Sequence, residues 1–266
     1  MFFRKMAVNL MADIKSLTAS VHPSPLFVLG NQKSGTTAVA ALLAEMSGLS
    51  VTLDLKKEWY HPVIDRIKTA DLSMADFVRR NKADFSRDII KEPSLSVFYP
   101  ELAAHFPYAK FAMVIRDPRD NIRSILNRLK IPGTVDDLRD EHETEITRAW
   151  ELIINGRWLG LDGSNHIEML AQRWNYITDS YLDNAQSILL LRYETFLNDK
   201  VGEMTRLAQS LGLAPKYDIS HRVDFQFQPA GDRNVRWRDF FGPTNLARIE
   251  RVCGEQMAKL GYEIET

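Results

Sequence analysis

The sequence predicts an α/β fold in which helices flank both faces of a parallel β-sheet. Residues 26–29, 111–115 and 188–191 form short runs that are apolar throughout, as is typical of strands buried on both faces. Segments with apolar residues at helical spacing follow the first two runs. Strands that alternate with amphipathic helices favour a parallel sheet covered on both sides.

The first unit is a strand, a polar turn and a helix. Pro25 and Gly30 bound the apolar run at residues 26–29, which indicates a short buried strand. The helix after the turn has four apolar residues at helical spacing, namely Val39, Leu42, Leu43 and Met46. The turn therefore lies where a strand ends and a helix begins.

The second unit repeats this order. After the strand at residues 111–115, Asp117 is a good N-cap and Pro118 suits the first position of a helix. The apolar face of this helix has four members, namely Ile122, Ile125, Leu126 and Leu129. Residues 88–90 form a weaker candidate strand.

Helical segments complete the predicted fold. Residues 73–81, 143–156 and 164–184 are expected to form a helical cap over the sheet edge. A C-terminal helix is predicted from about Thr244 to Leu260, before Gly261. Cys253 lies on the apolar stripe of that helix and is expected in the core.

Composition limits the class of protein. The 266 residues carry a formal charge of -1 and are 45% hydrophobic, which excludes a generally basic nucleic-acid coat and a disordered chain. Cys253 is the only cysteine, which excludes an internal disulfide and a cysteine-rich zinc site. We expect a single domain over residues 1–266, with residues 1–24 as an N-terminal extension.

The N-terminal segment has no apolar run of membrane-spanning length. Charged residues interrupt it, namely Arg4, Lys5, Asp13 and Lys15. Its apolar residues lie near helical spacing, which favours a helix packed in the core or in a homodimer over a membrane anchor. The sequence therefore predicts a cytoplasmic protein without a membrane span.

The loop after the first strand has the features of an anion site. Residues 30–37 read Gly-Asn-Gln-Lys-Ser-Gly-Thr-Thr, and the backbone N–H groups at the start of the next helix face any bound anion. The two glycines have the spacing of a nucleoside triphosphate loop, but Thr36 stands where that loop has its lysine. Lys33 lies inside the loop, where an ammonium stabilises charge that develops on a leaving phosphate. The pattern favours transfer of a terminal group without a metal.

Residues 33–37 read Lys-Ser-Gly-Thr-Thr, which resembles the 5′-phosphosulfate loop of sulfotransferases that use 3′-phosphoadenosine 5′-phosphosulfate (PAPS). The resemblance implies a P-loop nucleotide-kinase-like sulfotransferase architecture, PAPS as the donor and adenosine 3′,5′-bisphosphate (PAP) as the product. It also implies that the loop holds the 5′-phosphate and the sulfuryl group, through Lys33, Ser34, Gly35, Thr36 and Thr37.

A second family signature is an arginine at a strand end with a serine eight positions later. Arg116 and Ser124 match it, and Ser124 lies about two turns into the following helix. A guanidinium and a hydroxyl at these places can approach one phosphate. The resemblance implies that this is the 3′-phosphate of the donor.

Two further segments resemble parts of the family. The basic stretch at residues 231–238 resembles the segment that closes over the cofactor, which implies roles for Arg233 and Arg236. Leu-Arg-Tyr-Glu at residues 191–194 resembles another family segment, in which Tyr193 would approach the adenine.

The sequence leaves the general base open. The reaction needs one histidine or carboxylate near both the acceptor and the sulfuryl group. Lys-Glu-Trp-Tyr-His at residues 57–61 resembles the segment that holds the base in polysaccharide sulfotransferases, so Glu58 is the first candidate and His61 the second. Asp54 and Glu92 follow. Lys91 is a candidate to act with Lys33 on the sulfuryl oxygens.

The leading hypothesis is a PAPS-dependent sulfotransferase that acts on a hydroxyl or amine of a small molecule, glycan or lipid. The acceptor stays unidentified, and no metal or nucleic acid is expected to take part. One alternative is a phosphate-loop kinase that uses ATP, against which stands Thr36. The other is a nucleotide-binding module without catalysis.

Overall fold

The computed structural model describes residues 18–138, 146–225 and 235–264. The predicted N-terminal helix, the start of the predicted 143–156 helix and Arg233 lie outside these residues. None of the helices in the described ranges has the length and apolar character to cross a bilayer.

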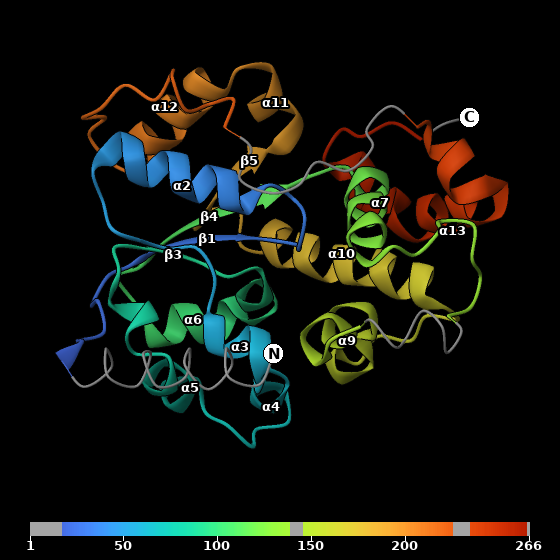
Figure 1. Ribbon diagram of the computed structural model, residues 1–266, viewed down its shortest axis with the longest axis horizontal. Coiled ribbons are helices and arrows are strands. Elements are labelled where there is room, and N and C mark those ends of the chain that lie inside the picture. The colour runs from blue at the N-terminus through green and yellow to red at the C-terminus, as the bar shows by residue number, and fades with distance from the viewer. Residues whose placement is uncertain (1–17, 139–145, 226–234, 265–266) are drawn as a thin grey trace.

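The core of the fold is a five-stranded parallel sheet in the order β2-β3-β1-β4-β5 (Figure 1). The strands are β1 Leu26–Gly30, β2 Val51–Thr52, β3 Ile89–Lys91, β4 Lys110–Ile115 and β5 Ile188–Arg192. The α/β class and four of the strands are therefore confirmed. Strand β2, a two-residue edge strand, is not predicted from the sequence, because two residues show no periodicity.

Helices and 3₁₀ turns connect these strands. Along the chain they are α2 Thr36–Ser47, α3 Lys56–Tyr60, α4 Asp65–Lys68, α5 Met74–Arg80, η1 Asp84–Ser86, η2 Pro93–Phe98, α6 Tyr99–His105, α7 Pro118–Leu129, α9 Arg148–Ile154, η3 Gly156–Leu159, α10 His166–Leu182, α11 Tyr193–Asn198, α12 Lys200–Ser210 and α13 Trp237–Lys259. As predicted, Asp117 caps α7, and its side chain accepts from Arg119 N.

Alternate side chains of β1 enter two separate cores, because successive residues of a strand point to opposite faces. Leu26 and Val28 pack with α2, α11 and α12, which lie above the sheet in Figure 1. Phe27 and Leu29 enter the larger core with residues of α5, α6 and α10. The Phe27 ring stacks on Phe111 of β4, with centroids 5.3 Å apart. Both faces are therefore buried, as the continuous apolar runs predict.

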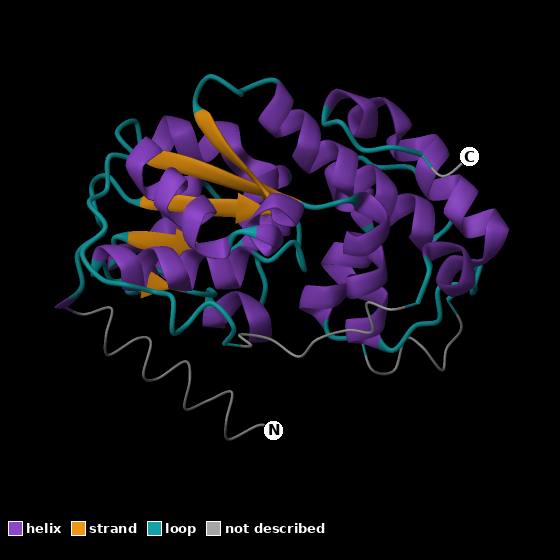
Figure 2. Ribbon diagram, turned by 90° about the horizontal axis from the view of Figure 1, so that it is seen from above, coloured by secondary structure: helices purple, strands orange, loops and turns teal. Residues whose placement is uncertain are grey.

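The strands point toward a group of helices at one end of the molecule (Figure 2). This group contains α7, α9, α10 and α13, which lie beyond the carboxyl ends of the strands in Figure 1. Residues 73–81 are also predicted to join the helical cap, but helix α5, which they form, packs on α6 instead. The chain passes from β3 on one side of β1 to β4 on the other, and ligands of open α/β sheets bind at such a switch point.

The C-terminal helix differs in one respect from the predicted one. Helix α13 begins at Trp237, seven residues earlier than expected, but Gly242 interrupts it with φ 68° and ψ 166°. Pro243 follows, and its ring cannot continue a regular helix from the preceding turn. The predicted helix from Thr244 is thus the part after this kink. Cys253 is fully buried there, as expected, and burial raises the pKa of its thiol.

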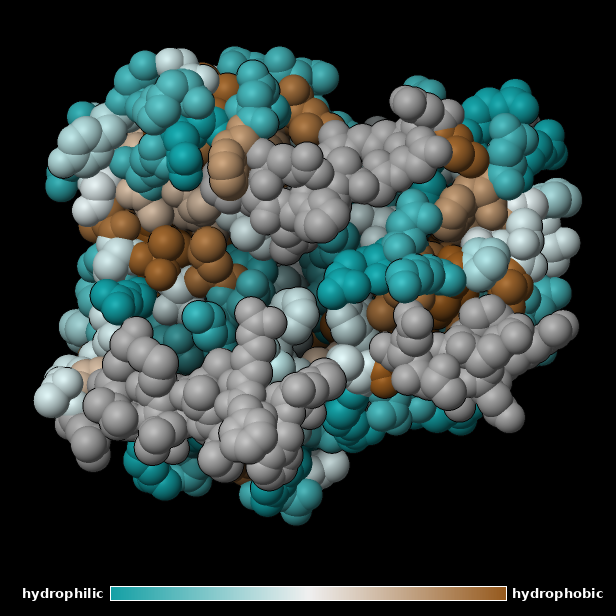
Figure 3. All heavy atoms as spheres, viewed as in Figure 1, coloured by the Kyte–Doolittle hydropathy of each residue, from teal (hydrophilic) through white to brown (hydrophobic). Residues whose placement is uncertain are grey.

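The face of the molecule drawn in Figure 3 shows hydrophobic side chains in separate small patches among hydrophilic ones. Most large apolar side chains of the described residues are instead inside the two cores.

Candidate active site

The loop between β1 and α2 turns sharply at two residues with left-handed backbones. Lys33 has φ 68° and Gly35 has φ 93°. Gly35 is the N-cap of α2, and no side chain caps the helix there. No acidic residue lies in its first turn. The start of α2 thus has no side-chain cap, and the helix dipole there favours an anion.

Gly35 is required by the packing as well as by its φ angle. A Cβ atom at this position would lie 2.3 Å from the Tyr193 ring. The Arg116 guanidinium lies over the same ring, 4.8 Å from its centroid. The structure therefore brings Tyr193, Arg116 and the loop together.

Asn121 of α7 fixes the loop by a set of hydrogen bonds. Its amide nitrogen donates to Gln32 O at 2.8 Å and to Ser34 Oγ at 3.0 Å. Its oxygen accepts from Asn31 Nδ2 at 2.9 Å. Sequence reasoning misses Asn121, although a polar residue four positions before Ile125, on the apolar face, is a usable signal.

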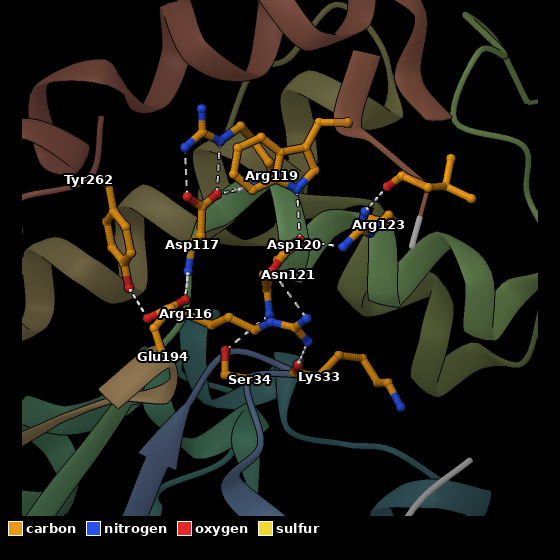
Figure 4. Close-up of polar contacts among 12 residues, drawn as sticks. Lys33, Ser34, Arg116, Asp117, Arg119, Asp120, Asn121, Arg123, Glu194 and Tyr262 are labelled. Atoms are coloured by element: carbon orange, nitrogen blue, oxygen red, sulfur yellow. Dashed lines mark hydrogen bonds and ion pairs between the residues drawn. The ribbon is translucent and has the colours of Figure 1, made fainter. Parts of the chain in front are cut away.

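Arg116 leaves the end of β4 and reaches the same loop. Its Nη1 donates to Lys33 O at 3.2 Å, and its Nη2 lies 3.5 Å from an oxygen of Asp120. The Nε atom is buried and has no hydrogen-bond partner among the described residues. Ser124 lies half-buried on α7, two turns after the helix start. Figure 4 shows the Lys33 side chain pointing away from the Arg116 group.

A cavity of about 270 Å³ lies beside the loop. The loop lines it with Lys33 and residues 35–37, and helix α3 and the end of β3 contribute Glu58 and Lys91. Apolar side chains, among them Trp150, form the remaining wall. Lys33 and Glu58 therefore face one space, although 25 positions separate them in the sequence.

The Lys33 ammonium lies in a positive environment. Burial lowers its pKa, and the charges of Arg128, Arg116 and Lys91 lower it further. An anion in the cavity would offset this repulsion, so the geometry favours binding of a negatively charged group.

Glu58 is a buried carboxyl with a strongly raised pKa. Burial raises the pKa to about 7, against lowering effects of the Val63 amide and the Arg80 charge. Oε2 accepts from Val63 N at 2.8 Å. Oε1 is 3.8 Å from Arg80 Nε and has no hydrogen-bond partner among the described residues, although the Asn81 side chain lies near enough to lower the pKa of the carboxyl. A group with this pKa is half-protonated near neutral pH, as general bases often are.

The raised pKa predicts a stability effect of Glu58→Gln. The native state binds this proton more tightly than the unfolded state, so wild-type stability falls as pH rises from the ordinary value to about 7. Glutamine cannot ionise and escapes this loss. From about pH 5 to pH 8, the free energy of unfolding of wild type should therefore fall by roughly 2 to 3 kcal/mol relative to that of the variant. Urea unfolding at both pH values measures this fall, and a constant difference between the two proteins would contradict the burial argument.

The other three candidate bases have different surroundings. Asp54 pairs with Lys91, with 2.6 Å between Oδ1 and Nζ. Glu92 is buried, and its two oxygens accept from the amides of Leu55 and Ser94. Burial raises the pKa of Glu92 as well. His61 is exposed at the end of α3 and is not among the residues that line the cavity.

The C-terminal segment meets α7 at Asp120. Trp237 Nε1 donates to Asp120 at 2.7 Å, and Arg123 donates to both Asp120 and Val235 O. Arg236 itself is 81% exposed and pairs with Asp239 at 2.8 Å. Arg236 is not among the residues that line the cavity, and Arg233 lies outside the described residues, so the roles of both stay predictions.

Arg173 of α10 is a buried charge that sequence reasoning misses. It is 1% exposed, and burial lowers its pKa to about 10. Nε donates to Asn31 Oδ1 at 3.3 Å and Nη2 to Gln32 Oε1 at 3.2 Å. Its place between Leu170 and Ile177 on the apolar stripe of the helix is the signal that a charge is buried here.

In the described ranges, no group of three or more His, Cys, Asp or Glu side chains is arranged to hold a metal ion.

Comparison with solved structures shows the same fold. A sulfotransferase from Mycobacterium avium has a TM-score of 0.54 and 13% identity, covering 98% of this chain and 82% of that chain. A mouse sulfotransferase solved with PAP has a TM-score of 0.52 and 14% identity, covering 95% and 92%. The sulfotransferase domain of the curacin biosynthetic pathway has a TM-score of 0.52 and 13% identity, covering 92% and 100%.

Sequence comparison gives the family. No curated protein matches the chain. The family model for the sulfotransferase domain matches residues 23–229, which is most of the chain and includes the loop, Glu58, Arg116 and Tyr193. The chain therefore belongs to the sulfotransferase domain family.

Proposed function

We propose that this sulfotransferase uses Lys33 to stabilise the leaving phosphate of PAPS and Glu58 to take a proton from the acceptor. The observation that supports this best is that both side chains line one cavity of about 270 Å³. The reaction class follows from the family. The family does not give the roles of individual residues or the nature of the acceptor, and we propose these here.

The residues at the loop fit the donor. An uncapped helix start and two left-handed residues offer backbone amides to a 5′-phosphosulfate. A buried, unpartnered Nε on Arg116 suits a second anion, and in the proposal this is the 3′-phosphate, with Ser124 as a further donor. Bound PAPS supplies an electrophilic sulfuryl group. Lys33 supplies a positive charge beside the oxygen on which negative charge develops.

Glu58 suits the base better than the other candidates. Its pKa of about 7 makes it a proton acceptor near neutral pH, and one of its oxygens has no hydrogen-bond partner among the described residues. Asp54 and Glu92 already accept hydrogen bonds from Lys91 and from backbone amides. His61 is exposed.

The acceptor part of the cavity combines an apolar wall with the base. Trp59, Trp150 and Ile153 contribute apolar side chains to its lining. This lining favours an acceptor that places a hydroxyl or amine on an apolar or ring-bearing body.

The test is donor turnover by the purified protein. PAPS is incubated with a panel of hydroxyl and amine acceptors, and PAP release and sulfated product are measured together. The proposal predicts acceptor-dependent release of PAP at the same rate with and without a chelator. Phosphoryl transfer from magnesium ATP to the same acceptors would support the kinase alternative. PAP binding without any turnover would support the module without catalysis.

Arg116→Met is expected to weaken PAP binding about 10- to 100-fold, because a charge-assisted contact to the 3′-phosphate is lost. Adenosine 5′-monophosphate lacks that phosphate, so its affinity should change much less. Titration calorimetry with both nucleotides measures the difference, and Arg206→Met, an exposed arginine paired with Glu203, is the control. An equal loss for both nucleotides would place Arg116 in the loop structure and not at the 3′-phosphate.

A further inference from the structure

Two buried polar atoms without hydrogen-bond partners among the described residues belong to side chains that line one small cavity behind the active site. Nη1 of Arg173 is a donor, and Oε1 of Glu58 is an acceptor. Both residues line a cavity of about 20 Å³, together with Ser94 and Leu152. The two residues are 1% and 4% exposed. Buried donors and acceptors are nearly always satisfied in folded proteins, by protein groups or by bound water.

The size and chemistry of this cavity suit one water molecule. A space of about 10 to 15 Å³ is enough for the centre of one water, which also needs two to four polar partners. Arg173 Nη1 offers a donor and Glu58 Oε1 an acceptor. Ser94 Oγ, which accepts from Gln32 Nε2 at 3.0 Å, has its own proton to donate.

Arg173 also contacts the loop. Its other two nitrogens donate to the side chains of Asn31 and Gln32, at 3.3 and 3.2 Å. The guanidinium is planar, so fixing two nitrogens fixes the direction of the third. The loop contacts therefore leave Nη1 as the nitrogen without a partner among the described residues, in a side chain that lines the small cavity.

We infer that Arg173 is a positioning residue for Glu58, which holds the loop with two nitrogens and donates through one bound water to the Glu58 carboxylate. The inference rests on the proposed function for its catalytic meaning, since it makes Arg173 the link between the donor loop and the base. Such a link orients the Oε1 atom of Glu58 and stabilises the charged form of the carboxyl.

The charged groups that face Glu58 come from three elements. The charges of Arg80 from α5 and Glu92 from the segment after β3 act on Glu58. Arg173 from α10 shares the lining of the small cavity with it. The residues of α9 that line the small cavity are Ala149, Leu152 and Ile153, which are not ionisable. Removing Arg173 leaves the Arg80 charge in place, but it also removes the positive charge that Glu92 faces. A change in the titration of Glu58 is therefore attributable to the link only when it also occurs in a variant that keeps both charges.

Carboxyl-carbon NMR of protein labelled at glutamate tests this without turnover. The signal absent from Glu58→Gln identifies Glu58, which should titrate at about 7 in wild type. In Arg173→Met the midpoint should rise by about one pH unit, because the carboxylate loses both a donor and a neighbouring positive charge. Arg173→Lys keeps a positive charge and should return the midpoint toward wild type. Arg206→Met should leave it unchanged.

Leu152→Phe tests the water itself with both charges retained. Leu152 lines the small cavity but not the larger one, so a bigger side chain there fills the space between Arg173 and Glu58. This variant should raise the Glu58 midpoint in the same direction as Arg173→Met. It also keeps the inference testable if the methionine variant does not fold.

The inference would be overturned if the Glu58 midpoint stayed unchanged in an Arg173→Met or Leu152→Phe protein that is folded and still binds PAP. This outcome is separate from a failure of the proposed function, which would appear as full turnover by Glu58→Gln. In the first case Arg173 serves only the loop, and its loss should then raise the KM for PAPS without shifting the pH profile of kcat.

Discussion

Glu58→Gln is expected to lower kcat by about 10²- to 10⁴-fold, the usual contribution of a general base. Glutamine has nearly the same shape and can still accept from Val63 N, so the cavity should keep its form. It cannot accept a proton from the acceptor. The rate of sulfated-product formation at saturating PAPS measures the effect, and PAP affinity should stay close to that of wild type.

The dependence of kcat on pH gives a second test of Glu58 as the base. Protonated Glu58 is inactive as a base, so wild-type kcat should fall as pH drops below about 7. The variant should lack this limb. Glu101→Gln, at an exposed position of α6, is the control and should follow wild type. A variant at position 58 that keeps wild-type kcat and its acid limb would remove Glu58 from the base role.

Lys33→Met is the second large effect, with an expected loss of about 10²- to 10³-fold in kcat. Methionine keeps an unbranched side chain of similar length but removes the charge beside the leaving oxygen. Because this charge develops in the transition state, kcat should fall more than the affinity for PAP. Single-turnover measurements with PAPS separate the two quantities.

The matched control for this variant is Lys56→Met, at an exposed lysine that begins α3 and does not line the cavity. It should behave as wild type. Lys33→Met should not change the backbone strain at position 33. Lys33 has φ 68°, and lysine and methionine both have a β-carbon, so both residues carry the same cost of this left-handed conformation. If Lys33→Met raised only the KM for PAPS and left kcat unchanged, Lys33 would bind the ground state and the transition state equally.

The sequence predicts the parts of the fold whose signals are local. A four-residue apolar run, a turn and a helix follow one another within residues 26–47, so the loop and its position between a strand and a helix are predicted without a structure. Strand β2 has two residues and joins the sheet only by pairing with β3. Its existence depends on a partner 38 positions away, which no local pattern reveals.

The site follows the same rule. Lys33 and Arg116 stand at strand ends, where the α/β class already directs attention. Burial of Glu58, which produces its raised pKa, depends on contacts from α5, α9 and α10 that come together only in the fold. Arg173 lies 141 positions from Gln32, and its role depends on that long-range contact. A charged residue within an apolar stripe indicates a buried charge, but the sequence does not show which residue it contacts.

The most direct test of the whole account is a crystal structure of the protein with PAP bound. We predict the 5′-phosphate on the amides of residues 33–37, within about 3 Å of Lys33 Nζ, and the 3′-phosphate at Arg116 and Ser124. The Glu58 carboxylate should face the space beside the 5′-phosphate. A bisphosphate bound elsewhere, or a Lys33 side chain turned away from the 5′-phosphate, would contradict the account.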